Sequence, residues 1–169
     1  VIVFSAFLGG CNSQAKLIAD KDAEAYRKQG DALGDEGQYA DAIAAYKKAI
    51  ARKPDYAEAY FDIGFAYLAL EQPTDAIAAY KKAVAIKPDF VRAHYWMAFS
   101  YRAIEKYADA IAAWKKYLAI VPSDFHTYYS MGTAYALLKQ YPEALTAFKK
   151  AIAINPDYVD AYCGMARAY

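Results

Sequence analysis

The amino-acid sequence predicts an all-α solenoid in which pairs of antiparallel helices stack one after another. The first observation is a fixed period: near-copies of one stretch each contain a proline 34 residues after the last, at Pro54, Pro88, Pro122 and Pro156. The second is that each period divides into two segments with apolar side chains at helical spacing. The third is a 58% hydrophobic composition rich in Ala and Tyr, which suits closely packed helices. A period of this length is typical of stacked repeat proteins.

The first ten residues form a short apolar run that ends in small residues. The sequence from Leu8 to Cys11, Leu-Gly-Gly-Cys, resembles the lipobox of bacterial lipoproteins. That resemblance implies a partial signal peptide over 1–10, cleavage before Cys11, and a diacylglycerol group on its thiol. The sequence has no initiator Met and no basic segment before the run, so we expect it to begin inside its signal. The alternative is an apolar helix or strand that packs on the repeats.

Residues 11–22 are polar apart from Leu17 and Ile18, and we predict a lipidated tether that turns helical as it enters the first repeat. No linker rich in Pro, Gly or Ser follows, so the sequence predicts one repeat array over 23–169 and no second domain. The array divides, with the proline at position 32 of each repeat, into 23–56, 57–90, 91–124, 125–158 and a partial fifth repeat at 159–169.

Each full repeat is predicted to hold two helices. In the second repeat Tyr60, Ile63, Gly64 and Tyr67 have the spacing i, i+3, i+4, i+7, which places them on one face of the first helix. The second helix carries an Ala and then an aromatic residue four positions on, and the proline stops it from continuing. The third and fourth repeats keep the first-helix spacing, in His94, Met97, Ala98 and Tyr101 and in Tyr128, Met131, Gly132 and Tyr135.

This pattern resembles the tetratricopeptide repeat family over residues 23–169. The resemblance implies a right-handed superhelical solenoid of four full repeats plus a partial fifth, and a non-catalytic role in protein–protein binding. Gly or Ala at the eighth position of a repeat allows the two helices to cross closely. The first repeat departs from the pattern, because Gln29 replaces an apolar residue and Gly34 and Gly37 stand late in its first helix. This fits an end repeat with one solvated face.

In this family the first helices line a concave groove, mainly through positions 2, 5, 6, 9, 12 and 13. Members that grip chaperone tails use a clamp of basic residues and Asn, and only Arg27 and Arg92 match it here. Phe65, Trp96 and Phe99 stand where polar residues are usual, which indicates either a binding surface or packing between neighbouring first helices. The predicted partner-binding residues are Phe61, Asp62, Phe65, Arg92, Tyr95, Trp96, Phe99, Arg102 and Tyr129.

The sequence contains no catalytic constellation, and we predict no enzyme activity and no cofactor. His94 and His126 have no Cys or acidic partners at metal-ligand spacing, so no metal site is expected, and His94 is predicted to be packed in the core. The net charge of +1 and the pI near 7.8 give no electrostatic case for nucleic acid. Cys11 and Cys163 lie at opposite ends, and we expect both thiols to be unpaired. Paired lysines recur on the second helices, either to contact anionic lipid or as a solvated face.

The sequence therefore predicts a membrane-anchored, non-catalytic scaffold of the bacterial cell envelope that binds a protein or peptide segment in its groove. We expect the lipid on Cys11 to hold it at the periplasmic face of the outer membrane or the outer face of the plasma membrane. Two alternatives stay open: a cytoplasmic adaptor whose first residues form an apolar cap, and an interaction domain of a larger protein.

Overall fold

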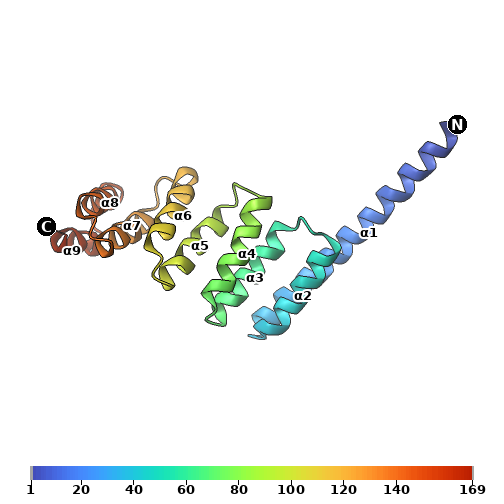
Figure 1. Ribbon diagram of the computed structural model, residues 1–169, viewed down its shortest axis with the longest axis horizontal. Coiled ribbons are helices and arrows are strands. Elements are labelled where there is room, and N and C mark those ends of the chain that lie inside the picture. The colour runs from blue at the N-terminus through green and yellow to red at the C-terminus, as the bar shows by residue number, and fades with distance from the viewer. Residues whose placement is uncertain (1, 169) are drawn as a thin grey trace.

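The structure is a computed structural model that describes the backbone of residues 2–168 and the side chains of residues 14–168. Over this part of the chain the backbone forms nine α-helices and no strand (Figure 1). The helices are α1 (Ile2–Asp35), α2 (Tyr39–Arg52), α3 (Ala57–Ala69), α4 (Pro73–Ile86), α5 (Val91–Ala103), α6 (Tyr107–Ile120), α7 (Phe125–Leu137), α8 (Tyr141–Ile154) and α9 (Val159–Arg167).

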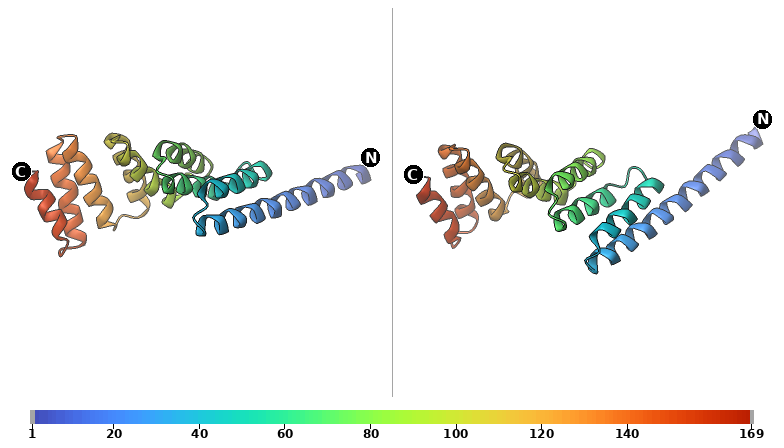
Figure 2. Two further views of the ribbon diagram at one scale, coloured as in Figure 1. Left: turned by 90° about the horizontal axis from the view of Figure 1, so that it is seen from below. Right: turned by 60° about the horizontal axis from the view of Figure 1, so that its bottom comes forward.

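The helices form antiparallel pairs that follow one another along the long axis of the molecule (Figures 1 and 2). Each helix packs mainly against the helix before it and the helix after it in the chain. The first helices of successive repeats also touch, α1 with α3, α3 with α5, and α7 with α9. This arrangement confirms the predicted all-α solenoid of stacked helix pairs.

Helix α1 is much longer than the first helices of the other repeats, and its N-terminal part projects beyond α2 (Figure 1). The backbone shows no boundary at 22/23, where the predicted tether meets the predicted first repeat. Ala23 is buried, and the side chains of Asp20 and Asp22 lie 4.0 Å from Lys53 and Arg52. None of the described helices combines the length and the apolar character that crossing a membrane requires.

The first helix of each full repeat ends in the same turn. The second residue after the helical end has positive φ: Gly37 (77°), Glu71 (58°), Glu105 (59°) and Lys139 (58°). In the first repeat the Gly37 N–H donates to the carbonyl of Gly34, and the next N–H donates to the carbonyl of Leu33. These paired bonds define a Schellman turn, which satisfies the last carbonyls of the helix. Gly37 is therefore in the turn and not late in the helix as predicted.

The two helices of a repeat cross where a glycine meets a ring. A Cβ atom on Gly64 would lie 2.5 Å from Cε1 of Tyr80, and one on Gly132 would lie 2.5 Å from Cε1 of Phe148. This confirms that the eighth position permits close crossing. In the third repeat the eighth position is Ala98, and Trp114, whose side chain is fully buried in the central core, stands where the neighbouring repeats have Tyr80 and Phe148.

Candidate partner-binding groove

The first helices carry the predicted partner-binding residues in consecutive positions along the stack. Asp62 and Phe65 come from α3, five residues from α5, and Tyr129 from α7. We call the surface formed by these residues and by three α1 residues, at groove positions 5, 9 and 13 of the first repeat, the groove face. Its residues are Arg27, Asp31, Asp35, Asp62, Phe65, Arg92, Tyr95, Trp96, Phe99, Arg102 and Tyr129.

The predicted aromatic residues at the centre of the groove face touch one another across two repeats. The rings of Phe65 and Trp96 meet edge to face with centroids 5.6 Å apart, and those of Trp96 and Phe99 are 6.0 Å apart. Tyr95 extends the cluster, 4.8 Å from Phe99. Phe65 is 46% exposed, whereas the other three rings are half-buried. The rings therefore pack between neighbouring first helices, and they also leave an apolar surface open to solvent.

Phe61 lies deeper than the other predicted partner-binding residues, although it contributes to the lining of the larger pocket described below. Its side chain is only 2% exposed, because it packs against Tyr80 and Phe90 with ring centroids 5.6 and 5.2 Å away. The guanidinium of Arg92 lies 4.4 Å above its ring. Phe61 thus supports the groove face from below.

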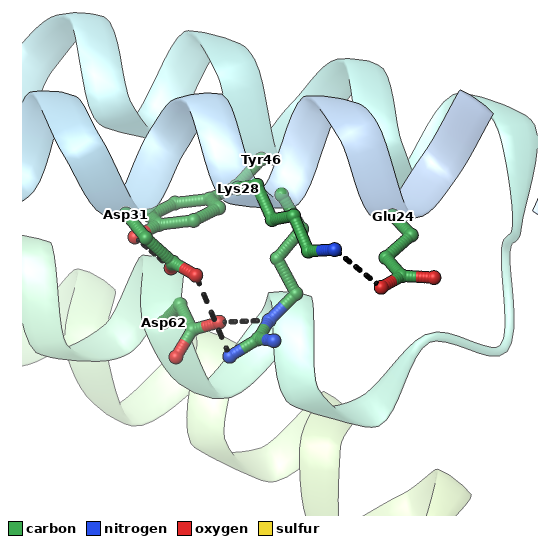
Figure 3. A network of polar contacts seen from close by, with 6 residues as sticks. Glu24, Lys28, Asp31, Tyr46 and Asp62 are labelled. Atoms are coloured by element: carbon green, nitrogen blue, oxygen red, sulfur yellow. Dashed lines mark hydrogen bonds and ion pairs between the residues drawn. The ribbon is translucent and has the colours of Figure 1, made fainter. Parts of the chain in front are cut away.

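A polar network joins the first two repeats at one end of the groove face (Figure 3). The Nε atom of Arg27 donates to Asp62 Oδ2 at 2.6 Å, and the hydroxyl of Tyr46 donates to Asp31 at 2.9 Å. Burial raises the pKa of Asp62, and the hydrogen bond and charge of Arg27 act in the opposite direction. Burial is also the main cause of the raised pKa of Tyr46, with the bond to Asp31 second.

Two pockets open onto the groove face. The larger, about 460 Å³, lies between α1, α3 and the start of α5, and its lining includes Asp31, Asp35, Asp62, Phe65 and Arg92. The smaller pocket, about 250 Å³, lies between α5 and the start of α7. Its lining includes Arg92, Tyr95, Trp96 and His126. Arg92 lines both pockets and so connects them.

The remaining predicted residues lie toward the C-terminal half. The guanidinium of Arg102 is 5.0 Å from the ring of Phe99, so it edges the aromatic cluster. Tyr129 belongs to a separate group, with ring centroids 5.8 Å from Phe148 and 5.3 Å from Tyr158. The structure therefore brings together the predicted residues of α3 and α5 but leaves Tyr129 apart from them.

The histidines and the described cysteine have no arrangement that suggests chemistry. His94 is 3% exposed and its Nε2 lies 2.8 Å from the carbonyl oxygen of Pro88, which confirms it as a core residue. His126 stacks on Phe125. Within residues 14–168 no three His, Cys, Asp or Glu side chains gather as metal ligands do. Cys163 is free and exposed, and Cys11 lies outside the described side chains.

The paired lysines lie over tyrosines of the first helices, in pockets that share no residue with those of the groove face. The ammonium groups of Lys82 and Lys150 are 5.5 and 5.4 Å from the ring centroids of Tyr60 and Tyr128. Their alkyl chains thus cover core tyrosines, while the lysine residues themselves stay exposed.

Comparison with known families decides the assignment of the repeats. Three tetratricopeptide repeat models match, at residues 27–89, 67–135 and 126–158. Residues 27–158 belong to the tetratricopeptide repeat family. A comparison with the sequences of curated proteins gives no significant match.

Solved tetratricopeptide structures agree with this assignment. A MamA protein is 28% identical, with a TM-score of 0.83 over 88% of this chain and 81% of that chain. A second MamA structure is 29% identical, with a TM-score of 0.78 over 83% and 82%. A tetratricopeptide repeat protein from Parabacteroides merdae, 19% identical, shares the fold with a TM-score of 0.80 over 88% of this chain and 59% of that one. The family and the fold indicate a protein–protein interaction scaffold of a typically non-catalytic kind.

Proposed function

We propose that this chain is a lipid-anchored scaffold of the bacterial cell envelope that holds a partner segment against Phe65, Trp96 and Phe99. The observation that carries the groove half of the proposal is the exposed ring of Phe65 in edge contact with Trp96. Contiguous apolar surface on a soluble repeat array is typical of binding sites. The partner segment therefore presents apolar side chains to this cluster.

The rings at position 9 of the repeats also bear on stability. In the first repeat this position is Asp31, which accepts the hydrogen bond of Tyr46. The second repeat has Phe65 at this position and Tyr80 in place of Tyr46, and the hydroxyl of Tyr80 is buried with no hydrogen-bond partner among the described residues. Leaving a buried donor unsatisfied destabilises a protein by about 1–3 kcal/mol. Folding alone thus favours a polar residue where Phe65 stands, which supports a binding role for that ring.

The third repeat also combines an aromatic ring at position 9 with an unsatisfied buried donor. Phe99 stands at position 9, its ring meets that of Trp114 edge to face at 5.8 Å, and the indole N–H of Trp114 is buried without a partner. Two neighbouring repeats therefore carry an aromatic ring on the groove face above an unsatisfied buried donor. This coincidence at adjacent repeats favours a shared function for Phe65 and Phe99.

Trp96→Ala tests the groove half of the proposal. We expect it to weaken binding of the purified partner about thirtyfold, because truncating a central aromatic anchor commonly removes about 2 kcal/mol or more. Since Trp96 is only half-buried, we expect Trp96→Ala to lower the Tm by less than the truncation of a fully buried core residue does. The measurements are calorimetric affinity and thermal unfolding on the same variant.

Tyr162→Ala is the matched control for Trp96→Ala. Tyr162 is 44% exposed and stands at position 4 of its repeat, away from the groove face. We expect its affinity for the partner to equal that of the wild type. Wild-type affinity in Trp96→Ala together with a large loss of Tm would assign Trp96 to the core and remove the anchor.

The lipid half of the proposal rests on the Leu-Gly-Gly-Cys sequence that ends at Cys11. If Cys11 carries the lipid, the part of α1 from Cys11 to Ala19, which precedes the ion pairs of Asp20 and Asp22 with the end of α2, forms a helical spacer of about 14 Å between the membrane and the stack. A diacylglycerol group supplies two acyl chains, which is what stable anchoring needs.

Metabolic labelling of the full-length protein with a fatty acid tests the anchor. We expect label in the wild type and none in Cys11→Ser, because the thiol is the atom that takes the lipid. Cys163→Ser serves as the control and should keep the label. Equal label in wild type and Cys11→Ser would remove the lipid anchor from the proposal.

A further inference from the structure

We propose that the larger pocket of the groove face binds a basic side chain of the partner segment, an arginine in preference to a lysine. This inference rests on the proposed function and adds the chemistry of the partner to it. The pocket and the aromatic cluster share Phe65. The partner therefore carries its basic residue next to an apolar one.

The charges that line the pocket favour a cation. Three carboxylates, those of Asp31, Asp35 and Asp62, line it together with one guanidinium group, that of Arg92. Arg27 is committed to Asp62 at 2.6 Å, and Arg92 covers the ring of Phe61. Asp31 and Asp35 are four residues apart on α1 and so share one face of the helix. Among the described residues, Asp35 has no ion-pair partner, and its exposed carboxylate is left to meet a ligand.

The aromatic side chains that line the pocket also favour a guanidinium group. Phe65, Tyr39 and Tyr46 line it beside the carboxylates. A guanidinium group stacks on aromatic faces and forms paired hydrogen bonds with carboxylates, so a pocket that offers both suits arginine. An acidic or phosphorylated side chain would meet like charge from Asp31 and Asp35.

A buried hydroxyl in the same repeat as Phe65 gives a second observation that bears on this pocket. Tyr80 is 0% exposed, and its hydroxyl has no hydrogen-bond partner. Its ring sits on Gly64 as the ring of Tyr46 sits on Gly30, and Tyr46 is part of the pocket lining. Burial raises the pKa of Tyr80, and the charges of Asp62 and Arg92 act on it in opposite directions. Tyr46 reaches Asp31 at position 9 of its repeat, and the residue at position 9 of the repeat that holds Tyr80 is Phe65, which lines the pocket.

Phe65 is the residue that leaves this hydroxyl unpaired. An acidic residue here, as at Asp31, would have satisfied it and would have removed the aromatic wall. Phe65 places an aromatic ring in the pocket and leaves the hydroxyl of Tyr80 without a hydrogen bond. This is expected if the ring contacts a ligand. The volume of about 460 Å³ lies within the range of small-molecule pockets and admits a guanidinium with its alkyl chain.

The test titrates isotope-labelled protein with N-acetyl-arginine amide and follows backbone amide signals by NMR. The control probe is N-acetyl-citrulline amide, which has nearly the same shape without the charge. We expect saturable shifts at Asp31, Asp35 and Phe65, with affinity for the arginine probe about tenfold higher than for citrulline. Raising the salt concentration should weaken the arginine probe and not the citrulline probe.

Two variants separate the charge from the ring. Asp35→Asn changes only an exposed carboxylate, and we expect it to weaken the arginine probe several-fold with an unchanged Tm. Phe65→Asn should also weaken the probe, while its Tm should be no lower than that of the wild type, because the amide can bond the hydroxyl of Tyr80. Trp96→Ala should keep wild-type affinity for the probe, since Trp96 is not part of the pocket lining.

The proposal is overturned if the arginine probe gives no saturable shift, if citrulline binds as tightly, or if Asp35→Asn binds arginine as the wild type does. These results are distinct from a failure of the proposed function. That failure would appear as wild-type partner affinity in Trp96→Ala, whatever the arginine probe does.

Discussion

Trp114→Ala is expected to lower the free energy of unfolding by about 3–5 kcal/mol, the largest single-residue effect that we predict for this chain. The side chain of Trp114 is 0% exposed and belongs to the core cluster that joins residues of α3 to α8. Its removal leaves a cavity in the core beside α5 and α7, the two helices against which α6 packs. For a protein of this length the Tm should fall by roughly 6–20 °C. Thermal unfolding followed by circular dichroism measures it.

Trp114→Phe is the matched control. The indole N–H of Trp114 has no hydrogen-bond partner, so its loss leaves no acceptor unpaired. The fourth repeat has Phe148 at the same position, where it is equally buried. We therefore expect Trp114→Phe to cost about 1–2 kcal/mol. Equal destabilisation by both variants would show that the indole ring, and not the filled volume, is what the core requires.

The repeat period predicted the fold because it fixes both helices of each unit. The predicted second repeat, 57–90, contains α3 from Ala57 to Ala69 and α4 from Pro73 to Ile86. Proline near the start of α4 and after its end limits that helix on both sides. The apolar spacing then decides which face is buried.

The candidate site was predicted less completely. Position within the repeat identifies the face of a first helix, but the neighbouring repeat decides how deep a side chain lies. Phe61 and Tyr95 share position 5, yet Phe61 is buried beneath Arg92 whereas Tyr95 is half-buried. The pair Arg27 and Asp62 was missed, because its partners are 35 residues apart and meet across two repeats. The signal available in the sequence was their opposite charge at adjacent groove positions, position 5 of the first repeat and position 6 of the second.

The N-terminal segment shows a second limit of prediction from the sequence. Its polar composition predicted a tether, but residues 12–22 contain no Pro or Gly, so nothing in them interrupts a helix that continues into the first repeat. The backbone is helical throughout this segment. The predicted lipobox from Leu8 to Cys11 has side chains outside the described residues, and lipidation of Cys11 stays a prediction.

Gly64→Ala is expected to destabilise the protein by about 1–3 kcal/mol, although alanine is the better helix former. The new Cβ would lie 2.5 Å from Cε1 of Tyr80, and that ring is held by close packing on all sides with 0% exposure. The ring must shift, and Phe61, which packs against it, must shift with it. The gain in helix propensity, about 0.5–1 kcal/mol, offsets only part of this strain. The midpoint of urea unfolding measures the balance.

Gly34→Ala separates the steric effect from the propensity effect. Gly34 also lies in a first helix, but the nearest atom to its Cβ would be the hydroxyl oxygen of Tyr46 at 3.9 Å, an ordinary contact. Without a clash, the propensity term acts alone, so we expect Gly34→Ala to be neutral or to stabilise by up to about 1 kcal/mol. The two substitutions should therefore move the urea midpoint in opposite directions. A higher midpoint for both would mean that the ring of Tyr80 yields without strain, and that the crossing of α3 and α4 does not require glycine.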